Sequence, residues 1–155
     1  MTVPRRTFLS HFLLCLAVAG AAFFAWKNAV FAMIWANDLS MMTSAIGALF
    51  VGTAMWLGWQ AWRQDDFASA TIRSDRPQYE GDSGFGHLAA LLSPALGMLG
   101  TTIGLSMQAK SLAGGATSFV ALATSLYSTG CGVAAYILIM LLTFNLEQGI
   151  RRARR

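Results

Sequence analysis

The sequence predicts an all-α integral membrane protein that crosses the bilayer four times. Of its 155 residues, 55% are hydrophobic and 12% are charged, against roughly 25% charged residues in soluble domains. The apolar residues gather in four stretches, each close to the ~20 residues that a helix needs to cross the hydrocarbon core. We therefore expect one membrane domain over residues 1–155, with spans at about 7–26, 40–62, 88–109 and 118–146.

The first span has a second interpretation. Arg5 and Arg6 precede its apolar core, and an alanine- and glycine-rich stretch follows at residues 17–22, which is the pattern of a signal peptide. The apolar run nevertheless continues through Phe23 and Trp26, past any suitable cleavage site. This continuation favours a retained transmembrane helix, with a cleaved signal peptide as the alternative.

The basic residues indicate how the chain is oriented. In a four-span arrangement all nine arginines lie on one side of the membrane, whereas Lys27 and Lys110 lie on the other. An excess of Lys and Arg marks the cytoplasmic side, so we expect both termini and a loop at residues 63–87 to be cytoplasmic, in a bacterial inner membrane. The net charge of +4 then reflects topology, since no basic helix carries the interleaved aromatic residues typical of nucleic-acid binding.

Several kinds of site are missing from the sequence. It contains no phosphate-binding glycine loop, no nucleophile elbow and no cluster of metal ligands. We therefore expect no enzymatic activity, no cofactor and no metal centre. Cys15 and Cys131 fall in apolar stretches, where packing is the usual role of a free cysteine. His11 and His87 fall near the inner ends of the first and third spans, and we interpret both as residues of the membrane interface.

The third apolar stretch is the most informative part of the chain. The chain has no Asp, Glu, Lys or Arg between Ser83 and Ala109. Within this segment, residues 93–105 nevertheless hold a proline, three glycines and two threonines. A lipid-facing helix does not favour such residues, whereas a helix packed tightly around a polar path does. Residues spaced three and four apart share one helical face, and in this stretch they are Pro94, Gly97, Thr101 and Gly104. Gly97 with Thr101 and Gly100 with Gly104 also form the small-residue pairs that let transmembrane backbones approach closely.

A similar stripe in the fourth stretch consists of Ser125, Thr129, Gly132 and Tyr136. Because the two spans are joined by a short connection, they are expected to pack as an antiparallel hairpin. Thr101 and Thr129 then both fall about 4–5 Å to the outer side of mid-membrane. A hydroxyl can donate and accept, so the pair can hold waters or relay a proton without being ionised.

A plainer interpretation of the two hydroxyls stays open. Ser and Thr in membrane helices often bond the carbonyl four residues earlier or bridge two helices, and such bonds are worth ~0.6 kcal/mol on average. No charged residue lies near the centre of any of the four spans. Since a proton site inside a membrane normally includes an ionisable group, we expect that this chain does not move protons unaided.

Two motifs, Gly97–Gly104 and Ser125–Gly132, resemble the core helices of the MotA/TolQ/ExbB proton-channel family. Relatives carry a proline and a glycine before a G-T-x-x-G step in one helix, and A-L-x-x-T-x-x-G followed by an asparagine in the next. In this chain Ser125 replaces the alanine, and Asn145 stands at the helix end. The resemblance covers about residues 93–145.

The resemblance implies a homopentameric ring around the helices of a smaller, single-span partner similar to ExbD, TolR or MotB, whose transmembrane aspartate carries the proton. The chain would be the ring-forming subunit of a proton-conducting motor or channel that couples the proton-motive force to mechanical work. The family's two threonines fall on Thr101 and Thr129, and Ser125 and Tyr136 are expected to line the same path. The expected helix-packing motif consists of Pro94, Gly97, Gly100, Gly104 and Gly132.

The sequence also departs from the family pattern. Thr124 stands where TolQ- and ExbB-like members often carry a glutamate, and the connection at residues 63–86 is too small for the rotor-binding domain of MotA-like stators. A structural scaffold or holin-like pore without proton coupling is therefore the alternative. A small multidrug-type exporter is disfavoured, because exchange requires a membrane-embedded carboxylate.

The topology can be tested with reporter fusions. Because the arginines sort to one side, reporters placed after Arg155 and within residues 63–86 should both give a cytoplasmic signal. A periplasmic signal at either site would contradict the four-span arrangement.

Overall fold

The computed structural model is all-helical over the residues it describes. The described residues are 6–29, 32, 34, 40–70, 83–115 and 119–153. They form four long helices: α1 (Arg6–Lys27), α3 (Met42–Ala70), α4 (Gly84–Ala113) and α5 (Phe119–Ala153). Each helix is long and apolar enough to cross a membrane. The predicted all-α class with four helices able to span a membrane is therefore confirmed over these residues, and it indicates a multi-pass membrane protein.

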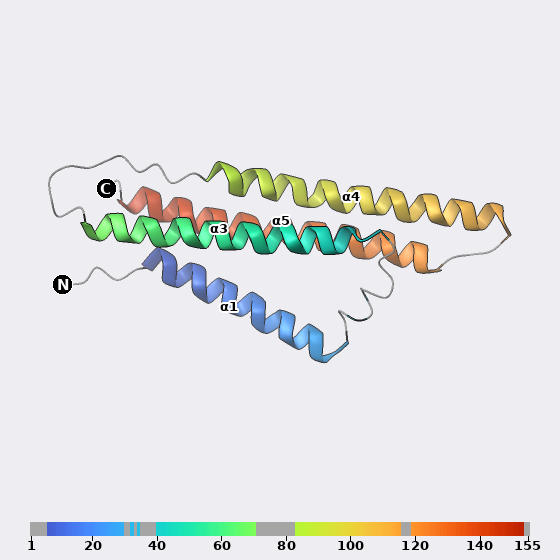
Figure 1. Ribbon diagram of the computed structural model, residues 1–155, viewed down its shortest axis with the longest axis horizontal. Coiled ribbons are helices and arrows are strands. Elements are labelled where there is room, and N and C mark those ends of the chain that lie inside the picture. Colours follow the sequence, from blue (N-terminus) through green and yellow to red (C-terminus); the bar gives the residue numbers. More distant parts are fainter. Residues whose placement is uncertain are drawn as a thin grey trace.

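Three of the helices form the body of the molecule. In Figure 1, α3, α4 and α5 run side by side, whereas α1 meets them near its own beginning and then diverges from them. Helix α1 begins, and α5 ends, at the same end of the bundle, which is here called the terminal end. Four helices that alternate in direction bring the beginning of the first and the end of the last to the same end of the bundle.

Several polar contacts attach α1 to the bundle at the terminal end. The Ser10 hydroxyl donates a hydrogen bond to Asn145 Oδ1, and Asn145 Nδ2 donates to the Thr7 carbonyl at 3.2 Å. The His11 ring is 3% exposed, and its Nε2 lies 3.1 Å from the Ala54 carbonyl of α3. Since a carbonyl only accepts, Nε2 is the protonated nitrogen. Beyond this attachment most of α1 faces away from the bundle, and only 6% of its most apolar 18-residue segment is buried.

Two apolar clusters fill the terminal half of the bundle. One joins α3 to α5 through Leu57, Ala61, Leu142 and Leu146, and side chains of α1 pack against it. The other joins α4 to α5 through Ala89, Ala90 and Ile139, with the Tyr136 ring packed on it. Dispersion contacts within these clusters fix the relative positions of the three helices.

The opposite half of the α4–α5 pair depends on small residues. A Cβ built on Gly97 would lie 2.9 Å from the Ser128 carbonyl, and one built on Gly104 would lie 2.8 Å from the Ala121 carbonyl. A Cβ on Gly132 would lie 2.7 Å from the Ser93 carbonyl and 3.1 Å from Gly97 Cα. Real Cβ atoms do not approach other atoms this closely, so only glycine fits at these positions. The two backbones therefore lie in direct contact, as small-residue pairs permit.

The helices are longer than the hydropathy pattern indicates. Helix α3 continues to Ala70 and α4 begins at Gly84, so both ends of the connection expected at residues 63–87 are helical. Likewise, α5 extends to Ala153. The expected boundaries followed the point where the chain becomes polar, whereas a hydrogen-bonded helix continues into water without requiring apolar side chains. The middle of that connection lies outside the described residues.

The close approach of α4 and α5 predicts different effects of two glycine substitutions. Gly132→Ala should lower the free energy of unfolding in detergent by about 1–3 kcal/mol, because the new methyl group overpacks the interface with Ser93. Gly130→Ala is the matched control, since Gly130 has nothing within 4 Å of its built Cβ. It should leave stability unchanged or raise it by up to ~1 kcal/mol through helix propensity. Equal effects of the two variants would contradict the packing described.

Candidate functional site

The two threonines singled out by sequence meet in the structure. Thr101 of α4 and Thr129 of α5 are joined by a hydrogen bond between their Oγ1 atoms. The pair lies at the level of the glycine contacts, one helical turn from Gly97 and close to Gly132. A threonine side chain is short, so the two hydroxyls meet only because the backbones behind them are already in contact.

The two threonine hydroxyls have more hydrogen-bond acceptors within reach than they have hydrogens to donate. Thr101 Oγ1 lies 2.9 Å from the Gly97 carbonyl and 3.3 Å from the Ser125 carbonyl. Thr129 Oγ1 lies 2.9 Å from the same Ser125 carbonyl. Each hydroxyl carries one hydrogen and two lone pairs. Consequently one threonine can donate to its partner while the other donates to a carbonyl, and lone pairs remain on both oxygens to accept a further hydrogen bond.

The pair faces the outside of the isolated chain. Thr101 is half-buried and Thr129 is exposed. On the side of the pair that points away from the α4–α5 contact, the flanking residues are exposed apolar side chains: Met98 (69%), Leu105 (51%), Leu126 (65%) and Val133 (47%). A polar group with unused hydrogen-bonding capacity is costly in lipid. An exposed pair of hydroxyls flanked by these apolar side chains is suited to a polar group from another helix.

Ser125 supports the pair through its backbone. Its carbonyl accepts from Thr129 and lies within reach of Thr101, while its own hydroxyl donates to the Leu122 carbonyl at 2.8 Å. The side chain is 4% exposed, and a Cβ on Gly104 would lie 3.0 Å from Ser125 Cβ. The residue therefore belongs to the helix contact, and its carbonyl, not its hydroxyl, faces the threonines.

The structure places Tyr136 and Pro94, which the sequence also singled out, away from the two hydroxyls. Tyr136 lies about two turns along α5 from Thr129, roughly 10 Å, with its half-buried ring on the cluster around Ile139. Pro94 lies inside α4 about two turns before Thr101. A proline ring leaves the carbonyl four residues earlier, that of Ala90, without its helical donor. Both residues thus lie between the threonine pair and the terminal end.

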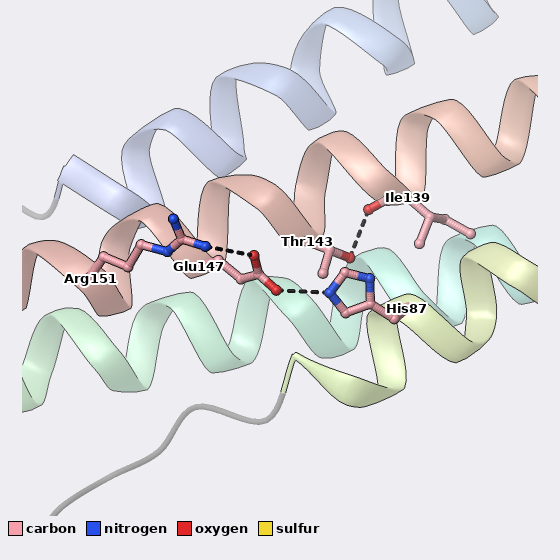
Figure 2. A network of polar contacts seen from close by, with 5 residues as sticks. All are labelled: His87, Ile139, Thr143, Glu147 and Arg151. Atoms are coloured by element: carbon pink, nitrogen blue, oxygen red, sulfur yellow. Dashed lines mark hydrogen bonds and ion pairs between the residues drawn. The ribbon is translucent and has the colours of Figure 1, made fainter.

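A second polar group was missed by the sequence analysis. His87 Nε2 lies 2.8 Å from Glu147 Oε1, and Arg151 Nη2 lies 4.0 Å from Glu147 Oε2 (Figure 2). The residues come from the beginning of α4 and the end of α5, so they are far apart in sequence. The register that pairs Thr101 with Thr129 places His87 level with Thr143 and leaves Glu147 about one turn farther along α5, so the sequence alone did not reveal this contact.

Within the described part of the chain, no three His, Cys, Asp or Glu side chains come close enough to hold a metal ion. Comparison of the chain with family models, with curated proteins and with solved structures finds no match. The function is therefore argued from the geometry of the threonine pair and its surroundings.

Proposed function

We propose that this chain is the ring-forming subunit of a proton-conducting motor or channel in a bacterial inner membrane, with both termini in the cytoplasm. In this proposal, Thr101 and Thr129 receive the transmembrane aspartate of a single-span partner. The observation that carries the proposal is the hydroxyl pair itself, which spans two glycine-packed helices and opens onto an apolar face. The resemblance of the two motifs to the MotA/TolQ/ExbB family supports the same assignment.

The chemistry of the pair suits both protonation states of a partner aspartate. A protonated carboxyl group donates its hydrogen to one of the free lone pairs on Thr101 or Thr129. An ionised carboxylate instead accepts, and a hydroxyl rotates to donate to it, giving up its bond to a backbone carbonyl. The exchange needs only rotation about the C–O bond. The pair can therefore bind the proton carrier before and after it releases its proton, without charge of its own.

Exposed glycines support assembly into a ring. Gly47 and Gly52 of α3 are exposed, and a Cβ built on either of them would meet nothing within 4 Å. Small residues on the outer surface of membrane helices mark surfaces where other helices approach. Five copies, as the family resemblance implies, would place the α4–α5 faces around the partner helices.

The alternative function is a scaffold or holin-like pore without proton coupling. It is favoured by one observation: each threonine hydroxyl also lies 2.9 Å from the carbonyl four residues earlier in its own helix. In that case the hydroxyls serve only to join α4 to α5, and the bond between them is worth ~0.6–1.7 kcal/mol.

Substitution of the threonines separates these functions. The chain is co-purified with the proposed partner, a single-span protein that carries a transmembrane aspartate, and reconstituted into vesicles that contain a pH-sensitive dye. Thr101→Val or Thr129→Val preserves side-chain volume and removes the hydroxyl, so proton flux should fall at least tenfold while the complex still assembles. Thr→Ser at either position should retain much of the flux.

Thr102→Val is the matched control, because Thr102 Oγ1 donates to the Met98 carbonyl of its own helix at 3.0 Å and is exposed. It should keep flux within twofold of the wild type. If both valine variants at positions 101 and 129 assemble and conduct normally, the threonines are packing residues and the scaffold is the better account.

A further inference from the structure

The contact of His87 with Glu147 brings two titratable side chains together on the same hairpin that carries the threonine pair. The distance of 2.8 Å between His87 Nε2 and Glu147 Oε1 is that of a hydrogen bond. Because a carboxylate only accepts, Nε2 carries the hydrogen and Nδ1 is left as the basic nitrogen. The side chains of His87 and Glu147 are 45% and 26% exposed. The pair is thus in contact with solvent at the terminal end yet partly enclosed by the bundle.

This pair is aligned with the threonines along the hairpin. Glu147 follows Thr129 by about five helical turns and lies on the same face of α5, roughly 27 Å away. His87 precedes Thr101 by about four turns, roughly 21 Å, and lies close to the same face of α4. A proton that leaves the threonine level toward the terminal end therefore approaches the His87–Glu147 pair.

Polar groups also lie between the two levels. Tyr136 and Thr143 are about two and four turns beyond Thr129 on α5. Thr143 is fully buried, and a Cβ built on Gly86 would clash with its hydroxyl, so it lies against the residue that precedes His87. Figure 2 shows Thr143 one turn from Glu147, with the imidazole of His87 on the same side of α5. The hydroxyl donates to the Ile139 carbonyl at 2.9 Å and keeps its lone pairs for accepting.

We propose that the His87–Glu147 pair is the site at which protons leave the path for the cytoplasm. This inference rests on the proposed function, because it assigns the inner end of the path that begins at the partner aspartate. A hydronium ion or hydrogen-bonded water chain on the hairpin side delivers a proton to His87 Nδ1. The imidazole becomes an imidazolium beside the Glu147 carboxylate, and the donor becomes neutral water. Cytosolic water then takes the proton from the imidazolium, which returns the pair to its starting state.

The rival explanation is that the pair only fastens the ends of α4 and α5. The structure argues against this explanation, because α4 and α5 do not depend on the ion pair to stay together. The two helices are already joined at this level by the cluster of Ala89, Ala90 and Ile139, and by the contact of Gly86 with Thr143. An exposed ion pair typically contributes less than ~1 kcal/mol. The test must therefore keep the hydrogen bond while removing the ability to carry charge.

Glu147→Gln meets this requirement, because the amide has the shape of the carboxylate and its oxygen still accepts from His87. In the reconstituted complex with the single-span partner, proton flux should fall at least tenfold, with unchanged oligomer size and a melting temperature close to that of the wild type. His87→Gln should have a similar effect. Glu147→Asp keeps a carboxylate and should recover flux to within threefold of the wild type.

Lys27→Gln is the matched control, since it removes a charge from the exposed last residue of α1, outside the α4–α5 hairpin; its flux should stay within twofold of the wild type. Two failures are distinguishable. If the wild-type complex does not conduct, or if Thr101→Val and Thr129→Val both conduct normally, the proposed function falls and this inference falls with it. If the threonine variants lose flux but Glu147→Gln and His87→Gln conduct normally, the proposed function stands and the assignment of the exit site is wrong.

Discussion

The direct contact between the backbones of α4 and α5 is the constraint on which the rest of the structure depends. Gly97, Gly104 and Gly132 leave no room for a Cβ, so the two helices approach as closely as their backbones allow. That approach gives the short threonine side chains a partner across the interface, and it fixes the antiparallel register of the hairpin. Larger residues at these positions would separate Thr101 from Thr129 by more than a hydrogen bond.

The hairpin combines two properties that a proton path in a membrane requires. Its interior is closed by glycine and serine packing, while hydroxyls with unused lone pairs remain at its outer edge. Neither Thr101 nor Thr129 is ionisable near neutral pH, so the site costs little in lipid compared with a buried charge. In the proposed function, the carboxylate therefore comes from a partner helix. Two ionisable groups of the hairpin, His87 and Glu147, lie together at its terminal end.

Much of the fold could be predicted from the sequence, because apolar length alone determines which segments can cross a bilayer. The small-residue spacing in α4 also indicated a close helix contact, and equal membrane depth indicated that Thr101 and Thr129 would meet. The ends of the helices were predicted less well, since hydropathy does not report where a helix stops in water. The roles of Ser125 and His87 required coordinates: one depends on the direction of a carbonyl, and the other on a partner 60 residues away in sequence.

The central claim is that the Thr101–Thr129 pair receives a carboxyl group from another helix. A cryo-EM map of the complex with its single-span partner tests this most directly. The account predicts a ring of this chain, with the α4–α5 faces turned inward and the partner's aspartate within hydrogen-bond distance of one of the two threonine hydroxyls in at least one subunit. A map in which the pair faces lipid, or in which the chain forms no ring, would contradict the account.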